Sequence, residues 1–289
     1  MKRGLLYACL TLATLGALAT VATILALRPV WRATARADQL IRQAQLLSAR
    51  GRPQASRAKV EEALRLAPHY PLAHRELGLH LLAQGDFEPG IAELRQVAQA
   101  LPYDSGAAWE LAHALSAAHH TEEAEQWFAR VTRMEPNNGA AYAMLANCQL
   151  QRNATQEALH TAEAGVRISP RLATTHITLG LARWRAGDLE GARIALDEGL
   201  RLRPSDIPTM LSLAAVTGKM HRFDLALVYL QRAVRLIPND PILWVALGTA
   251  LFETKHLSEA EQAFSRALAL APSNQMARVG LARSRLRPR

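Results

Sequence analysis

The sequence predicts an all-α protein, an α-solenoid of about seven stacked helical hairpins preceded by one N-terminal transmembrane helix. Three observations predict this fold. Residues 5–27 carry no charge, prolines recur every 34 residues through the rest of the chain, and small residues occupy two fixed positions in each 34-residue segment. Apolar residues make up 49% of the chain, which is enough to bury a continuous core and argues against a disordered protein.

The first element along the chain is a candidate membrane anchor. The 23 uncharged residues Leu5–Leu27 would form a helix about 34 Å long, which crosses a hydrocarbon layer about 30 Å thick with a slight tilt. We therefore predict a basic N-terminus at residues 1–4, a transmembrane helix at 5–27 and a basic juxtamembrane linker at 28–36. The alternative is a cleaved signal peptide, because Lys2 and Arg3 resemble its basic start, but the apolar core of such a peptide has only ~7–15 residues.

The charges that flank this span leave the side of the membrane open. Two basic residues precede the span and four arginines follow it within residues 28–42, so a count of Lys and Arg favours cytoplasmic repeats. A short basic N-terminus, however, commonly stays inside and sends the remainder across. Arginines that follow the span could also rest on anionic head groups. The chain has thirty arginines and four lysines, and we expect a single-pass protein of the bacterial inner membrane with cytoplasmic or periplasmic repeats.

Beyond the anchor, proline marks a period of 34 residues. Proline cannot continue a helix and disfavours the helical conformation of the residue before it, so each of these prolines is predicted to follow the end of a helix. Two residues after most of them stands a short polar side chain that can cap the next helix. The prolines are Pro68, Pro102, Pro136, Pro170, Pro204, Pro238 and Pro272, and the capping residues are Asp104, Asn138, Asp206, Asp240 and Asn274.

Two further positions in each segment hold only small residues. Small residues on the facing sides of two helices let the helix axes approach each other, and larger apolar residues fill the space around that contact. Each segment is therefore predicted to be a helical hairpin. In two of the segments the turn between the two helices is predicted near Gly85 and near Gly187. The small residues are Ala44, Gly78, Ala112, Ala146, Gly180, Ala214 and Gly248 at the first position, and Ser56, Gly90, Ala124, Ala158, Ala192, Ala226 and Ala260 at the second.

Through these residues the chain resembles the tetratricopeptide repeat family, whose 34-residue helix-turn-helix unit has this register of small residues and a terminal proline. The best single match is the set Trp244, Leu247, Gly248, Leu251, Ala260, Phe264, Ala267 and Pro272. The resemblance implies seven repeats, at residues 37–70, 71–104, 105–138, 139–172, 173–206, 207–240 and 241–274. The departures from the family pattern are Gln149, Arg183 and Thr217 in first helices and Ala162 in a second helix.

No single hairpin can bury both of its apolar faces, so neighbouring hairpins must stack, and the expected result is a right-handed superhelix. Both ends of such a stack need a cover. At the front, the polar first repeat, with Gln43 and Arg50, can provide it. At the back, residues 275–289 are predicted to form a C-terminal capping helix with a basic tail.

In this architecture the inner surface is lined mainly by the first helix of each hairpin. We predict an apolar and partly aromatic groove there, with Trp109 and Trp184 as anchors and Arg75, His113 and Asn147 setting the orientation of a bound helix or peptide. The alternative is that both tryptophans are core residues. The predicted groove residues are Arg75, Leu79, Trp109, His113, Asn147, Ile177, Leu181, Trp184 and Leu211.

The sequence offers little to support catalysis. The closest metal-like cluster, His119 and His120 with Glu122 and Glu123, lies on one turn, where adjacent side chains seldom converge on one ion. No glycine-rich phosphate loop, His-Glu-x-x-His or Gly-x-Ser-x-Gly motif occurs. Residues 71–275 hold 18 basic and 22 acidic residues, so the repeats lack the basic stripe of a nucleic-acid-binding protein. We expect no enzymatic activity, metal or cofactor, and no nucleic-acid partner.

The predicted function is that of a membrane-tethered, protein-binding scaffold or assembly factor whose groove holds a partner helix or peptide. The alternative is a regulatory or substrate-delivery subunit of a separate membrane or envelope-biogenesis enzyme. The resemblance also suggests two known modes of peptide binding, but this chain lacks the residues that each of them requires. A carboxylate clamp would need lysine and asparagine where Arg75, Leu79, Trp109 and His113 stand, and an asparagine ladder is missing from the sixth positions. The partner, the pathway and the oligomeric state are not specified by the sequence.

Overall fold

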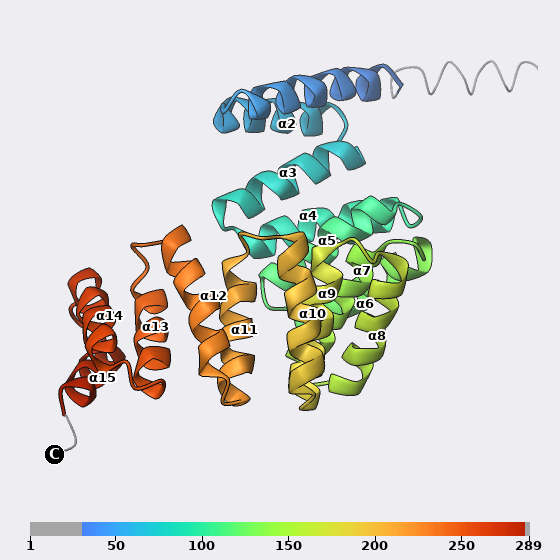
Figure 1. The fold of residues 1–289 in the computed structure, drawn as a ribbon. Coiled ribbons are helices and arrows are strands. Elements are labelled where there is room, and N and C mark those ends of the chain that lie inside the picture. Colours follow the sequence, from blue (N-terminus) through green and yellow to red (C-terminus); the bar gives the residue numbers. More distant parts are fainter. Residues whose placement is uncertain (1–30, 287–289) are drawn as a thin grey trace, which may run out of the picture. The chain divides into compact units, whose positions relative to one another are not determined.

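The structure is a computed structural model of the 289-residue chain and describes residues 31–286 (Figure 1). Regular secondary structure in this described range is entirely helical, which confirms the predicted all-α solenoid. The chain divides into two compact units, Met1–His120 and Thr121–Arg289. The predicted anchor at residues 5–27 lies outside the described residues. None of the helices formed by residues 31–286 combines the length and the apolar character that a bilayer crossing requires.

The first unit begins with a helix whose described part covers residues 31–49, so residues 31–36 of the predicted linker are helical. This helix pairs with α2 (Pro53–Leu66) around a core of Ala37, Leu40 and Ile41. The next pair is α3 (Pro71–Gln84) and α4 (Phe87–Ala100), and α5 (Ser105–Ala117) packs against α4.

The second unit continues the same arrangement in chain order. It starts with α6 and then holds four hairpins, α7 with α8, α9 with α10, α11 with α12 and α13 with α14, after which α15 packs against both α13 and α14 (Figure 1). One hydrophobic core cluster extends from Ala192 in α10 to Ala277 in α15. The helices are α6 (Thr121–Met134), α7 (Gly139–Gln151), α8 (Thr155–Ile168), α9 (Ala173–Ala186), α10 (Leu189–Leu202), α11 (Ile207–Lys219), α12 (Phe223–Leu236), α13 (Pro241–Glu253), α14 (Leu257–Leu270) and α15 (Gln275–Arg285).

The helix ends agree with the positions predicted from the prolines, the turn glycines and the capping residues. Each second helix ends two residues before the proline of its repeat, as α2 does at Leu66 before Pro68. Gly85 and Gly187 follow α3 and α9 in the left-handed conformation, with φ of 87° at both, which a residue with a Cβ rarely adopts. The predicted capping side chains, Asp104, Asn138, Asp206, Asp240 and Asn274, all accept hydrogen bonds from the first turn of the next helix.

Asp206 allows a test of this capping. Its carboxylate accepts hydrogen bonds from the backbone N–H of Thr209 at 3.0 Å and from the Thr209 hydroxyl at 2.5 Å. Burial acts to raise the pKa of Asp206, but the hydrogen bonds from Thr209 together with the hydrogen bond and charge of Arg203 outweigh it, so the pKa lies below its usual value. We expect Asp206→Ala to lower the free energy of unfolding by about 1 kcal/mol at pH 7, measured by urea denaturation.

The same contact predicts a pH dependence with a defined sign. Because the pKa of Asp206 is lower in the folded state, its stabilisation is fully present above the unfolded-state pKa of about 3.9 and is lost as the pH falls through the folded-state pKa. The stabilities of the wild type and of Asp206→Ala should therefore converge in acid. Asp206→Asn is the control, because it keeps an acceptor oxygen without a titrating group. A wild-type advantage over alanine that persisted in strong acid would contradict this role for the carboxylate.

The two predicted small positions are buried in every repeat. A Cβ added to Gly180 of α9 would lie 3.1 Å from the carbonyl oxygen of Ala192 in α10 and 2.6 Å from Cγ of Leu196. The two helices of this hairpin are therefore in backbone contact at the point that the 34-residue register predicts. That register is confirmed in the structure.

Candidate peptide-binding groove

Four of the predicted groove residues lie in the first unit, Arg75 and Leu79 on α3 and Trp109 and His113 on α5. Arg75 forms an ion pair with Glu110, so the neighbouring repeat already engages its guanidinium. The rings of Trp109 and His113 meet edge to face with their centroids 4.5 Å apart, and partial burial lowers the pKa of His113. Leu79 is exposed, whereas Trp109 is half-buried. The structure thus brings Trp109 and His113 together on α5.

The remaining five predicted residues lie in the second unit. Asn147 on α7 is half-buried. Ile177, Leu181 and Trp184 on α9 and Leu211 on α11 are partly buried and pack against the core cluster that extends from α10 to α15. Trp109 and Trp184 are both half-buried, and Trp184 packs against this core cluster.

An apolar cavity in the second unit extends the predicted surface beyond Leu211. It has a volume of about 420 Å³, and the one polar side chain in its lining is Thr249, whose hydroxyl donates to the carbonyl of Val245 at 2.9 Å. At its open rim, Ile242 and Met276 expose 64% and 71% of their surface. The lining residues are Leu211, Ala214, Ala215, Gly218, Phe223, Ala226, Leu230, Ile242, Val245, Ala246, Thr249, Ala250 and Met276.

A second cavity, of about 360 Å³, adjoins the first and shares Val245, Thr249 and Met276 with it. It reaches from α13 to Val279 and Arg283 on α15. We refer to the two cavities together as the C-terminal groove. The guanidinium carbon of Arg283 lies 5.1 Å from the centroid of the Phe252 ring, so the α15 end of the groove carries a positive charge, with the carboxylate of Glu253 also in the lining.

The C-terminal groove was not predicted from the sequence, although the 34-residue spacing of its lining residues indicates it. Val245 stands 34 residues after Leu211, and Val279 stands 34 residues after Val245, so all three occupy the same position in successive repeats. The predicted groove ends in the sixth repeat. Continuing the same positions through the seventh repeat and into residues 275–286 would have identified these residues.

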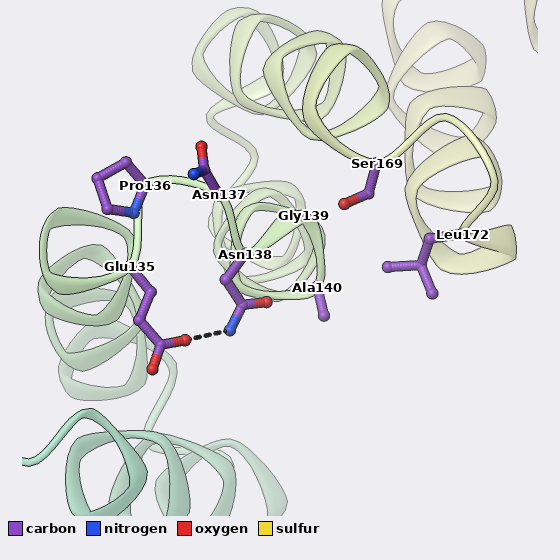
Figure 2. Close-up of a pocket in the computed structure, with 8 residues that line it drawn as sticks. All are labelled: Glu135, Pro136, Asn137, Asn138, Gly139, Ala140, Ser169 and Leu172. Atoms are coloured by element: carbon purple, nitrogen blue, oxygen red, sulfur yellow. Dashed lines mark hydrogen bonds between the residues drawn. The ribbon is translucent and has the colours of Figure 1, made fainter.

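A further hollow, of about 560 Å³, lies where α6 meets α7 and α8 meets α9 (Figure 2). Asn138 Nδ2 donates to Glu135 Oε2 at 2.7 Å, and Asn138 Oδ1 accepts from the backbone N–H of Ala141 at 3.2 Å. Figure 2 shows the Ser169 hydroxyl pointing across the hollow towards Gly139. The side-chain amide of Asn138 therefore has a structural role, because it stabilises the turn and caps α7.

Models of the tetratricopeptide repeat family match residues 41–105, 81–148 and 219–286, together more than half of the chain. The chain belongs to the tetratricopeptide repeat family. Proteins built from this repeat are generally interaction scaffolds without catalytic activity of their own, which agrees with the expectation of a protein-binding role.

Comparison with curated proteins found no match by sequence. Solved structures share the tetratricopeptide fold. A tetratricopeptide repeat protein from Parabacteroides merdae superposes with a TM-score of 0.67 at 12% identity, covering 86% of this chain and 99% of that one. A chain of the APC/C hetero-tetramer Cut9-Hcn1 gives a TM-score of 0.65 at 17% identity over 78% of this chain and 45% of that one, so this chain spans less than half of it. YrrB superposes with a TM-score of 0.53 at 15% identity, covering 64% of this chain and 96% of that one. At these identities the likeness concerns the fold alone.

The tetratricopeptide models leave residues 149–218 unmatched, and the departures from the family pattern lie in this stretch. Gln149 is buried with its Oε1 unpaired, and Thr217 is buried with its hydroxyl donating to the carbonyl of Leu213 at 2.7 Å. Leu150, one residue after Gln149, is buried in the core. The hairpin stack therefore continues through these repeats with shifted apolar contacts.

His74 and His176 each connect one repeat to the repeat before it. His74 and His176 are half-buried, and the Nε2 of each donates at 2.8 Å to the carbonyl of the proline that ends the previous repeat, Pro68 or Pro170. Trp244 Nε1 makes the same contact with Pro238. This tetratricopeptide position therefore ties one repeat to the next, and the sequence reading did not anticipate the carbonyl partner.

His119 and His120 lie at the turn between α5 and α6. His119 occupies the turn with φ of 63°, and His120 Nε2 lies 2.7 Å from Glu88 Oε1. Throughout residues 31–286, no three His, Cys, Asp or Glu side chains are placed to share a metal ion.

Cys148 on α7 is predicted to be chemically inert in the folded protein. Its side chain is 2% exposed, and burial raises its pKa to about 11, with the nearby charge of Glu125 adding to the effect. Two pKa units above the ordinary thiol correspond to about a hundredfold less thiolate at neutral pH. In a Cys9→Ser chain we expect a thiol reagent to react slowly with Cys148 and to react rapidly after denaturation. Fast native-state labelling would show that the fourth repeat opens locally.

Proposed function

We propose that this tetratricopeptide repeat protein is a membrane-tethered scaffold that holds the apolar side of a partner helix or extended peptide in the C-terminal groove. The observation that carries the proposal is the larger cavity of this groove, which has Thr249 as its one polar lining side chain and exposed Ile242 and Met276 at its rim. Exposed apolar surface of this kind marks an interaction site in a folded protein. YrrB, whose structure is similar, is a tetratricopeptide repeat protein with an unusual peptide-binding site, and this supports peptide binding here.

The charges at the rim indicate which partner fits best. Arg283 stands at the α15 end of the groove, and four more arginines follow Met276 in the sequence. An apolar segment flanked by acidic residues would therefore be favoured, with the apolar contacts providing affinity and the charges providing orientation. Within the second unit, half-buried Trp184 adds an aromatic side chain to the surface proposed for the partner.

The tether is supported by the 23 uncharged residues Leu5–Leu27. A scaffold fixed to a bilayer raises the local concentration of its partner at the membrane surface, which suits an assembly factor of the bacterial inner membrane. The second candidate function is a regulatory or substrate-delivery subunit of a separate membrane or envelope-biogenesis enzyme. Co-purification of one enzyme in stoichiometric amount would favour it, whereas several sub-stoichiometric partners would favour the scaffold.

Affinity capture with detergent-solubilised full-length protein tests the groove. The test variant is Ile242→Glu with Met276→Glu, which places charge at the rim of the groove. The matched control is Ile194→Glu with Val228→Glu, which changes two apolar residues that are 54% and 58% exposed and lie outside the groove. We expect the test variant to lose the captured polypeptides and the control to retain them. Identical recovery with both variants, at unchanged helical content, would refute binding in the groove.

A further inference from the structure

The loop between α2 and α3 presents a second apolar surface, separate from the C-terminal groove. Leu66, the last residue of α2, and Pro68 in the loop are exposed, as is Trp31, the first described residue, with 62% of its surface accessible. An apolar cavity of about 560 Å³ lies between residues 33–34 and the loop. Figure 1 shows the connection from α2 to α3 at the same end of the first helical pair as the start of the first helix. We refer to Trp31, Leu66, Pro68 and His69 as the loop face.

The loop is held firmly in this position. The Tyr70 hydroxyl donates to Asp38 Oδ1 at 3.0 Å, which ties the loop to the first helix. The Pro68 carbonyl accepts from His74 Nε2 at 2.8 Å, which ties it to α3. Ala67 and Tyr70 pack against the core of this hairpin, while Leu66 and Pro68 stay exposed. The apolar side chains of the loop face are therefore presented on a fixed backbone.

The surroundings of the loop face are basic. Arg32, Arg36 and Arg65 are all exposed. The nearby carboxylate of Glu62 accepts a hydrogen bond from Lys59 at 2.6 Å, and this bond, with smaller contributions from the charges of Arg36 and Arg65, holds the pKa of Glu62 low. Since Lys59 already compensates Glu62, the three arginines leave this end of the first unit with a net positive charge.

Chain length places the loop face close to the end of the uncharged stretch. Trp31 follows Leu27 by four residues, which span at most about 14 Å when fully extended. The head-group region on each side of the hydrocarbon layer is about 5–8 Å thick. If residues 5–27 cross a bilayer, Trp31 lies within about 14 Å of the hydrocarbon edge, in the head-group region or just outside it, and the loop lies beside residues 33–34 that follow it.

We propose that the loop face rests in the interfacial region of an anionic bilayer, with Trp31 and Leu66 among the head groups and Arg32, Arg36 and Arg65 on lipid phosphates. This inference rests on the membrane tether of the proposed function. Tryptophan favours the interface because its ring is apolar while its N–H can bond to the polar layer, and arginine matches phosphate geometry. The contact fixes the angle at which the first repeat leaves the membrane.

The test uses the full-length chain with Cys9→Ser, reconstituted in vesicles of phosphatidylcholine and phosphatidylglycerol. A fluorophore is attached at Leu66→Cys, and quenching by lipids that carry a spin label on the head group is measured. The matched control is Phe87→Cys, because Phe87 is similarly exposed, at 38% against 43% for Leu66, and lies beyond the far end of the 14-residue helix α3. We expect several-fold stronger quenching at position 66 than at position 87.

Replacing Arg32, Arg36 and Arg65 by glutamine, or omitting phosphatidylglycerol, should reduce quenching at position 66 while vesicle binding persists. Flotation of the vesicles distinguishes the two ways of failing. If the protein floats with the vesicles but positions 66 and 87 are quenched equally, the tether stands and the loop-face contact is wrong. If the protein does not float with the vesicles, the membrane tether is wrong and the loop-face contact falls with it.

Discussion

Replacing Phe264 by alanine is expected to lower the free energy of unfolding of the C-terminal hairpin by about 3–5 kcal/mol. Phe264 on α14 is 3% exposed, and its ring fills the space beside two glycines, Gly248 on α13 and Gly280 on α15. A Cβ on either glycine would come within 2.8 Å or 2.4 Å of ring carbons, so the ring joins all three helices. Removing it leaves a cavity that they share.

Hydrogen exchange is the suitable measurement for Phe264→Ala, because a repeat array need not unfold in one step. We expect the amides of α13, α14 and α15 to lose most of their protection, while those of α7 and α8 change little. Gly280→Ala provides the control through a double-mutant cycle. Its added methyl group should destabilise the wild type by clashing with the ring and should cost much less in the Phe264→Ala background. Strictly additive effects would mean that the ring does not occupy this site.

The repeat could be predicted from the sequence because each of its determinants is local and recurs. Proline ends a helix through its own backbone, Asp104 caps through the N–H groups two and three residues ahead, and Gly85 allows a left-handed turn by lacking a Cβ. Each signal depends on near neighbours alone, and seven copies of it remove the ambiguity of a single occurrence. The helix boundaries and the small-residue contacts therefore follow from the period.

The candidate site was less predictable because its state depends on residues in other repeats. Arg75 was expected to orient a ligand, but Glu110, 35 residues later, engages it in an ion pair. Trp184 is both a surface and a core residue, since α9 packs one side of its ring against the second unit's core. Whether an apolar side chain such as Ile242 is covered depends on which helix follows, and no pattern within its own repeat contains that information.

Capping at the C-terminal end also departs from expectation in its details. The predicted solvating helix is present as α15, yet Met276 and Val279 expose 71% and 58% of their surface. These two residues belong to the positions that line the C-terminal groove, so α15 contributes to the groove lining as well as covering the end of the core. Such a double role reconciles the apolar residues of α15 with its arginines, which occupy other positions on the same helix.

Ala192→Leu is expected to lower the free energy of unfolding by about 1–3 kcal/mol. Ala192 on α10 has no accessible surface, and its carbonyl oxygen lies where a Cβ on Gly180 would come within 3.1 Å. The larger side chain must therefore push α9 and α10 apart or leave its preferred rotamer. Thermal and urea unfolding of the full-length protein, followed by circular dichroism, would measure the loss.

Ala282→Leu is the matched control for Ala192→Leu. Ala282 stands 34 residues after Gly248, at the first small position, but it is exposed because α15 has no second helix to pack against it within the described residues. An added isobutyl group there meets solvent, and surface substitutions of this kind change stability by about 0.5 kcal/mol or less. A large effect at both positions would indicate that helix α15 itself does not tolerate leucine. No effect at either position would contradict the conclusion that close helix approach requires the small residues of this register.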